Sequence, residues 1–231
     1  MLTKLHTAIT TCRACPRLVT YREEIARQKR RAYAADPYWG RPIPGFGDPN
    51  GWLLIVGLAP GAHGANRTGR VFTGDRSGDF LYSALHRAGL ASQAESTGVD
   101  DGLELRGVYI LTALRCAPPG NLPAPDELAR CVPFLDREIS LVRARVVLAL
   151  GKIAWDSVLG HASRVFGAVP RPRPKFAHGA RVDLGEGPRG LRMVGSFHVS
   201  QQNTFTGRLT AAMFDRVLAT CRAVAAPPPR A

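Results

Sequence analysis

Four of the five cysteines are spaced as ligands for an inorganic group. Cys12 and Cys15 form a C-x-x-C pair that a proline follows, and Cys116 and Cys131 form a second pair with 14 residues between them. Four thiolates suit a zinc ion or an iron–sulfur cluster. The wide second pair and the proline after Cys15 favour a [4Fe–4S] cluster over zinc. The alternative is that these are small buried side chains, as we expect for Cys221.

A glycine-rich stretch is the second chemical signal. Residues 57–81, GLAPGAHGANRTGRVFTGDRSGDFL, follow an apolar run that is typical of a buried strand. So much glycine between a strand and a helix indicates backbone held close to a ligand. The stretch has neither a P-loop lysine nor a G-x-G-x-x-G dinucleotide pattern. It therefore predicts the floor of an active site that does not hydrolyse nucleotides.

Two titratable side chains and one aromatic ring are candidates for chemistry at this floor. Asp75 is either a general base or electrostatic stabiliser, or a carboxylate that caps the following helix. His198 is either a donor to a developing anion or a histidine that bonds its own loop. Phe72 is either a platform on which a base stacks or part of the core.

The elements that must position these residues follow from the apolar pattern. Four apolar runs are expected to be strands, at residues 52–57, 108–112, 146–150 and 193–195. Helices are expected between and after them, at about 78–88, 126–144, 152–160 and 206–223. This alternation predicts an α/β fold of three α/β/α layers with a central, mainly parallel four-stranded sheet. The strand ends would then bring residues 57–75, residues 115–121 and His198 around one cleft.

Details of these helices and of the remaining segments are less regular. Ser77 and Thr206 are plausible N-caps for the helices that follow them, and the first 31 residues are expected to be partly helical. Residues 91–106 are polar and acidic, which is typical of a surface excursion. Residues 163–190 are rich in Pro, Gly and Arg, and they give no assignment.

Size and charge limit the class of partner. The 231 residues, 45% of them hydrophobic, suit a single domain over 1–225 with a disordered tail at 226–231. The net charge is +13, and its cations are 27 arginines and 4 lysines. This charge favours a polyanion such as DNA or RNA as the partner. No apolar run could span a membrane and no secretory signal is recognisable. We expect a cytoplasmic monomer, associated with the nucleoid when on DNA, without a membrane partner.

Four motifs in this order resemble the uracil-DNA glycosylase superfamily. GLAPG at residues 57–61 resembles its first active-site motif, and residues 69–78 resemble its base-stacking segment. Residues 115–121 resemble its cluster-ligand loop, and HVS at residues 198–200 resembles its final histidine motif. The cysteines are similar to those of its iron–sulfur branches, and the glycine-rich stretch is similar to family 5, the type b enzymes. The resemblance spans residues 12 to about 210.

The resemblance implies a monofunctional DNA glycosylase of base excision repair. It would flip uracil and other deaminated bases, hypoxanthine included, out of double-stranded DNA and hydrolyse the N-glycosidic bond. The implied catalytic residues are Asp75, His198 and Asn121. The implied contacts to base or DNA are Gly57, Ala59, Pro60, Gly61, Phe72, Ser200 and Gln201. The implied ligands of a structural [4Fe–4S] cluster are Cys12, Cys15, Cys116 and Cys131.

Two departures from related families shape the expected chemistry. Ala59 occupies the place where other families carry an Asp or Asn that helps water attack, so that role passes to Asp75. Ala113 stands where narrower members carry an asparagine that reads the edge of uracil, which predicts a roomier pocket. The alternative function is a non-catalytic iron–sulfur module that binds DNA or senses redox state.

Overall fold

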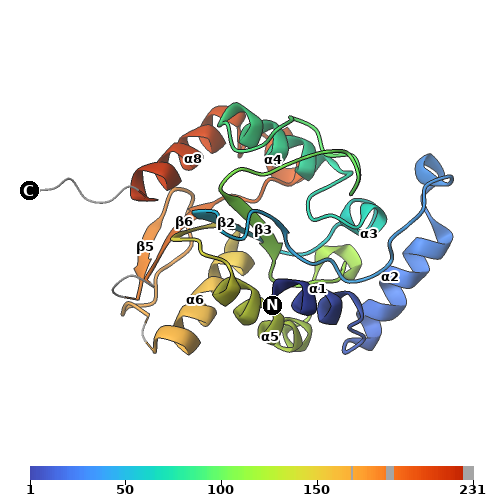
Figure 1. Ribbon diagram of the computed structural model, residues 1–231, viewed down its shortest axis with the longest axis horizontal. Helices are drawn as coiled ribbons and strands as arrows, with labels where there is room; N and C mark the ends of the chain where they lie inside the picture. The colour runs from blue at the N-terminus through green and yellow to red at the C-terminus, as the bar shows by residue number, and fades with distance from the viewer. Residues whose placement is uncertain (168, 186–189, 226–231) are drawn as a thin grey trace, which may run out of the picture.

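One six-stranded sheet organises the molecule (Figure 1). The computed structural model describes residues 1–167, 169–185 and 190–225, so the tail expected at 226–231 lies outside the described residues. The strand order is β1-β3-β2-β4-β6-β5. The strands are β1 (Phe46–Gly47), β2 (Leu53–Gly57), β3 (Val108–Thr112), β4 (Val146–Leu150), β5 (Arg181–Leu184) and β6 (Leu191–Ser196).

The four strands predicted from the apolar runs are the four central ones. β3, β2, β4 and β6 run parallel to one another, whereas β1 and β5 pair antiparallel at the two edges. The predicted count of four strands was therefore wrong, because it lacked these two edge strands. β1 has only two residues and β5 is mostly exposed, so neither has the apolar pattern that reveals a buried strand.

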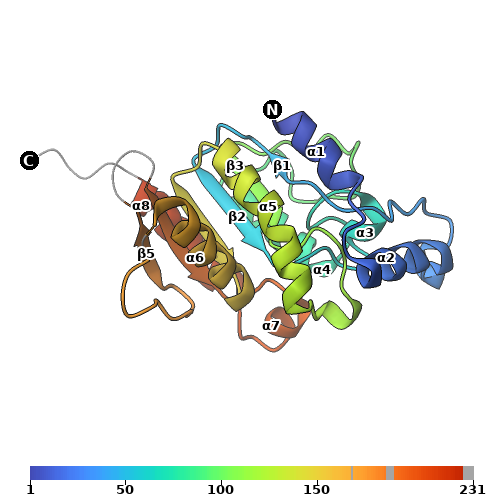
Figure 2. The same cartoon turned by 90° about the horizontal axis from the view of Figure 1, so that it is seen from below.

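The central strands are buried on both faces, as parallel strands between helices are, except at Arg192 of β6. Leu53 and Ile55 of β2 face a core built with α4 (Arg76–Arg87) and α8 (Ala211–Ala225). Leu54 and Val56 face a second core on the opposite side. Figure 2 shows the two helices that cover this second core, α5 (Pro125–Leu141) and α6 (Lys152–Phe166). The three-layer architecture predicted from the sequence is confirmed, and Cys221 lies fully buried in the first core.

Two helices precede the sheet. α1 (Leu2–Thr10) packs against α5, and α2 (Pro16–Gln28) packs beside the short α3 (Ala65–Thr68). α2 begins directly after Cys15 because proline is well suited to the first helical position, where its missing N–H costs nothing. The cysteine pair therefore stands at the entrance to α2.

The structure decides between the caps predicted for α4 and shifts the start of the last helix. Asp75, not Ser77, caps α4, because only the carboxylate accepts from the backbone N–H groups of the first turn. The helix expected at 206–223 is α8, which begins only at Ala211, and a separate short helix, α7 (Gln201–Phe205), precedes it. Thr206 is the C-cap of α7 and not the N-cap of the last helix. No helix among the described residues is long and apolar enough to cross a membrane.

Candidate active site

The predicted motifs meet at the carboxyl edge of the parallel strands. Gly57, at the end of β2, pairs in register with Thr112, at the end of β3. The pairing continues past the strands, because the N–H of Ala113 donates to the carbonyl of Gly57 at 2.9 Å. On the other side Leu150, at the end of β4, pairs with Ser196 of β6. The glycine-rich stretch, the loop after β3 and the His198 segment therefore line one edge of the sheet.

Phe72 and His198 form an aromatic pair at this edge. Their ring centroids lie 6.1 Å apart, with the planes inclined by 35°. The Phe72 ring rests on Gly57, where a Cβ atom would come within 2.6 Å of the ring. Phe72 has the left-handed φ of 51°, and the hydroxyl of Tyr82 donates to the carbonyl of Val71 beside it. Phe72 thus belongs to the core and also lines the edge.

The His198 imidazole is neutral. Burial lowers the pKa of His198 to about 4, so the ring carries one N–H donor and one acceptor at physiological pH. Its carbonyl accepts a 2.8 Å hydrogen bond from the amide of Asn203, which holds the turn into α7. Within the described residues the ring makes no hydrogen bond, so it does not bond its own loop. A partly exposed donor at a strand end is suited to a ligand atom.

Asp75 uses one oxygen as a helix cap. Oδ1 accepts from the N–H groups of Ser77 and Gly78 at 2.9 and 3.1 Å. Oδ2 lies against the first motif, where a Cβ atom on Gly61 or Gly64 would be 2.6 or 2.0 Å from it. Burial is the main effect on this carboxyl, and it raises the pKa of Asp75. The two interpretations of Asp75 are compatible, because each oxygen has its own surroundings.

Three further predicted residues lie on exposed or partly exposed turns. Asn121 ends a 3₁₀ turn, Pro119–Asn121, with a left-handed φ of 58°, and its exposed side chain makes no hydrogen bond with described residues. Ser200 is the N-cap residue of α7, and the exposed Gln201 is its first helical residue. Their roles toward DNA stay predictions.

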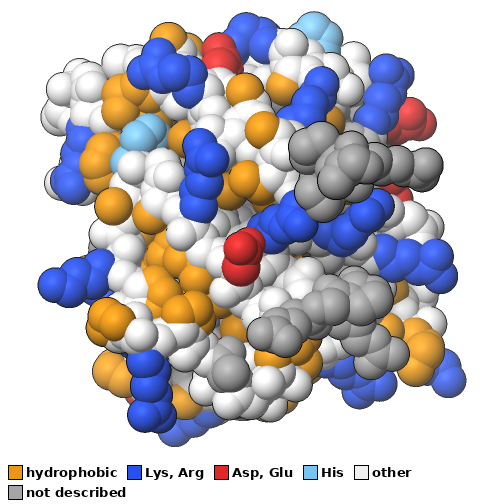
Figure 3. Space-filling model, turned by 90° about the vertical axis from the view of Figure 1, so that its left-hand side faces the viewer, with side chains coloured by type: hydrophobic (Ala, Val, Ile, Leu, Met, Phe, Trp, Pro, Cys, Tyr) orange, Lys and Arg blue, Asp and Glu red, His pale blue; other side chains and the backbone are white. Residues whose placement is uncertain are grey.

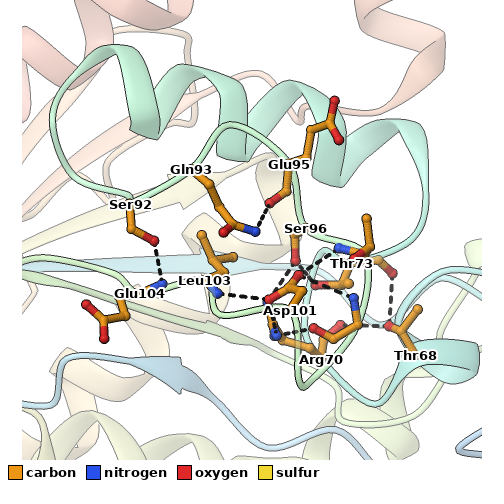
Figure 4. A network of polar contacts seen from close by, with 12 residues as sticks. Thr68, Arg70, Thr73, Ser92, Gln93, Glu95, Ser96, Asp101, Leu103 and Glu104 are labelled. Atoms are coloured by element: carbon orange, nitrogen blue, oxygen red, sulfur yellow. Dashed lines mark hydrogen bonds and ion pairs between the residues drawn. The ribbon is translucent and has the colours of Figure 1, made fainter.

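Residues 91–106, predicted as a surface excursion, are largely at the surface, and part of this segment also braces the Phe72 segment. Figure 4 shows Arg70 reaching from this segment into the 91–104 loop. Its guanidinium donates to the hydroxyl of Ser96 at 3.0 Å and to Asp101 at 2.8 Å. Ser96 also shares a 2.7 Å hydrogen bond with Thr73. The available signal was an arginine inside a glycine-rich stretch, but the sequence does not say which carboxylate it meets.

The segment before β5, which the sequence left unassigned, lies beside His198. His178 stacks on Phe197 at 4.9 Å between centroids, and its Nδ1 accepts from the Phe197 N–H at 3.2 Å. The same segment carries exposed Arg171, Arg173 and Lys175. Figure 3 views the molecule from the side where β5 lies, and Lys and Arg clearly outnumber Asp and Glu on it. The side of the molecule seen in Figure 3 is therefore basic.

The four predicted cluster ligands line one cavity between α2, α5 and the loop after β3. These are Cys12, Cys15, Cys116 and Cys131, and none is in a disulfide. The last three are buried with Leu18 and Leu114, and Ala59 of the first motif packs against them. Within the described ranges no three metal-ligating side chains converge as they would round a single ion. The geometry brings the four thiols together and by itself assigns no metal.

Comparison with known proteins decides the family. Residues 44–222 match the family described as "Uracil DNA glycosylase superfamily". The chain belongs to this superfamily. A type-5 uracil-DNA glycosylase of Mycobacterium bovis is 52% identical over 224 residues, which are 96% of this chain and 81% of the relative. That of Thermus thermophilus is 52% identical over 218 residues, 94% of this chain and 95% of the relative.

More distant relatives agree with this assignment. A type-5 uracil-DNA glycosylase of Pyrobaculum aerophilum is 44% identical over 210 residues, 91% of this chain and 87% of the relative. The glycosylase family, the type-5 relationship and the enzyme class, a hydrolase of N-glycosyl bonds, are confirmed. The alternative of a non-catalytic module is set aside.

Proposed function

We propose that this glycosylase excises uracil and other deaminated bases, hypoxanthine included, from double-stranded DNA, and that it acts as a monomer. The proposal rests on the side chains that meet at the carboxyl edge of the parallel strands. There the ring of Phe72 lies over Gly57 with a neutral His198 beside it, and Asp75 follows on the same segment as Phe72. The type-5 relatives are named for the excision of uracil from DNA.

The base must leave the helix before its glycosidic bond can be reached. Flipping costs a few kcal/mol and costs least for a mispaired base, which favours U·G over U·A. The Phe72 ring would stack on the extruded base. Ser200 and Gln201 start α7 beside the site, and they would press into the minor groove where the base has left.

Bond cleavage separates charge, and the two titratable residues suit the two charges. The sugar becomes oxocarbenium-like and the base leaves as an anion. The N–H of neutral His198 donates to a carbonyl oxygen of the leaving base, and such a donor contributes about 3 kcal/mol. The Asp75 carboxylate balances the sugar's positive charge or orients the attacking water, a task for which Ala59 has no polar group.

The breadth of substrate rests on Ala113. Ala113 is 2% exposed, and its N–H is already bonded to the carbonyl of Gly57. Neither its side chain nor its N–H can read the Watson–Crick edge of a base. A site without a hydrogen bond at this position rejects other bases weakly. Asn121 is assigned a contact to the base or sugar from the loop after β3.

The cysteine cavity is proposed to hold a [4Fe–4S] cluster. Its four cysteines are the right number of ligands, and its wall also contains a buried arginine with an unpaired N–H, which suits an anionic group. The cluster supplies a cross-link when bound. It would join α2 to the loop after β3 and to α5, and so support Ala59 in the first motif.

Duplex oligonucleotides test the activity. We expect alkali-labile sites at U·G, U·A and hypoxanthine·T pairs, with U·G excised fastest under single-turnover conditions. The same oligonucleotides as single strands measure the preference for duplex. Intact hypoxanthine strands would contradict the broad range, and faster cleavage of single strands would contradict the duplex substrate.

Metal analysis and light scattering test the remaining proposals. We expect a brown protein with about four iron atoms per chain and the mass of a monomer in solution. Zinc in a colourless protein would overturn the cluster, and a dimer mass would overturn the monomer.

A further inference from the structure

Arg22 places a buried positive charge in the wall of the cysteine cavity. It lies on α2 and is 2% exposed. Its Nη1 donates to Sγ of Cys116 at 2.9 Å, and its Nη2 donates to the carbonyl of Cys12 at 3.1 Å. One guanidinium therefore contacts both halves of the predicted ligand set.

The charge of Arg22 has no buried counter-charge. The nearest carboxylate is Glu23, whose oxygen lies 4.0 Å from Nη2, and the Glu23 side chain is 45% exposed. Both Glu23 oxygens already accept hydrogen bonds from Arg13. The Nε of Arg22 is buried and has no hydrogen-bond partner. Burying a cation without a partner is costly, so this arrangement calls for an anion in the cavity.

The other two arginines of the cavity are balanced. Arg115 is equally buried and its guanidinium nitrogens make no hydrogen bond, but its Nη2 lies 2.7 Å from Oε2 of the buried Glu138, which supplies the counter-charge. Arg130 is 47% exposed and pairs with Asp126 at 3.2 Å. Among the described residues that line the cavity, Arg22 is therefore the buried cation left without a carboxylate within hydrogen-bond distance.

We infer that Arg22 is a fifth binding residue of the iron–sulfur site, a cationic donor to the thiolate-ligated cluster. This inference rests on the proposed [4Fe–4S] cluster. A cluster with four thiolates is an anion, so a buried guanidinium retains it and, by donating to the Cys116 sulfur, raises its reduction potential. The carbonyl of Arg22 also accepts from the amide of Asn66 at 3.2 Å, which joins the cluster site to the glycine-rich stretch.

The test compares Arg22→Gln and Arg22→Lys with the wild type and with Arg27→Gln. Arg27 is an exposed residue of the same helix, and so serves as a matched control. The readouts are iron per chain, the rate at which a chelator bleaches the visible absorbance of the cluster, and the cluster's reduction potential. We expect Arg22→Gln to lose iron about tenfold faster, as for the loss of a hydrogen bond to a charged group, and to have a more negative potential. Arg22→Lys keeps the positive charge but lacks the planar guanidinium that can donate to two acceptors at once. It should lose iron at an intermediate rate.

Each outcome decides between the proposals. Wild-type iron loss and potential in Arg22→Gln would overturn the role of Arg22 and leave the cluster standing. If Arg22→Gln yields no folded protein by circular dichroism, wild-type values in Arg22→Lys would overturn it equally. Equal acceleration in Arg27→Gln would show a general effect of charge, and would also overturn it. A wild type without iron would instead contradict the cluster itself.

Discussion

At the scale of single residues, Asp75 and His198 show how burial sets chemistry. Burial raises the pKa of the Asp75 carboxyl and lowers that of the His198 imidazole, because it disfavours the charged form of each. Two backbone N–H groups act in the opposite direction on Asp75 and favour its ionised form. The site therefore presents a carboxylate that is poorly solvated and an imidazole that is uncharged.

Two substitutions at Asp75 separate the cap from the charge. Asp75→Asn keeps an oxygen for the N–H groups of Ser77 and Gly78, so its thermal stability should match or exceed the wild type. Asp75→Ala loses the cap and should be destabilised by about 1 kcal/mol. Single-turnover excision should fall strongly in both variants, with little change in affinity for DNA. An active Asp75→Asn variant would show that the charge takes no part in catalysis.

His198→Ala tests the donor to the leaving base. The loss of a donor of this kind should slow base release about a hundredfold or more, with binding of undamaged duplex unchanged. Single-turnover excision from U·G duplexes measures the rate, and filter binding measures the affinity. Base release at the wild-type rate would remove His198 from the mechanism.

The neutral state of His198 predicts a dependence of stability on pH. The unfolded chain protonates this residue near pH 6.5, whereas the folded chain does so only near pH 4. The unfolded state thus binds more protons in between, and acidification from pH 6.5 to 4 should destabilise the wild type. Urea unfolding of wild type and His198→Asn across this range isolates the effect. Parallel curves for the two proteins would contradict the neutral imidazole.

At the scale of elements, the loop 91–104 holds the segment that carries Phe72. Phe72 needs support because its left-handed backbone is unfavourable for a bulky residue. Arg70 supplies this support from inside the segment through Ser96 and Asp101 (Figure 4). Burial alone would raise the pKa of Asp101, but Arg70 and backbone N–H groups lower it to about 2.

Asp101→Asn tests this support, with the exposed neighbour Asp100→Asn as the control. Removing one partner of a buried ion pair leaves Arg70 uncompensated, and should destabilise the protein by about 3 kcal/mol. Excision should slow as Phe72 loses its position. Because the folded pKa is depressed, the stabilisation by Asp101 should be present at neutral pH and lost as the pH falls toward 2. Equal melting temperatures for the two variants would contradict the brace.

At the scale of the whole molecule, the net positive charge favours binding to a polyanion. The net charge is +13, and most of it is arginine, which is suited to phosphate. Arg171 and Lys175 lie on the segment beside the His198 motif, whereas Arg106 precedes β3 at the opposite edge of the sheet. The fold therefore distinguishes cations near the site from cations remote from it.

The salt dependence of DNA binding tests this distinction. The logarithm of the binding constant should fall linearly with the logarithm of salt concentration. Arg171→Gln and Lys175→Gln should each reduce this slope by about 1, and Arg106→Gln should leave it unchanged. Fluorescence anisotropy with undamaged duplex measures the slopes. The same slope in all four proteins would place the bound DNA elsewhere.

The limits of sequence reasoning lie where structure depends on distant partners. Apolar runs revealed the four central strands because burial on both faces leaves a continuous signal. β5 was missed because an exposed edge strand has no such signal. The sequence offers both Ser77 and Asp75 as caps of α4 because both residue types can cap a helix, and only the backbone geometry decides between them. Asn121 was assigned by its place in a motif, and it lies exposed on a turn.

The sequence alone determined the parallel core, the order of the motifs and which four cysteines line one cavity. These features depend on local pattern and spacing. Only the tertiary structure decided the protonation state of His198 and the two surroundings of Asp75. It alone also decided which arginine of the cysteine cavity lacks a carboxylate. These properties depend on burial and on partners remote in the chain, because desolvation and hydrogen bonds are set by which groups meet in three dimensions.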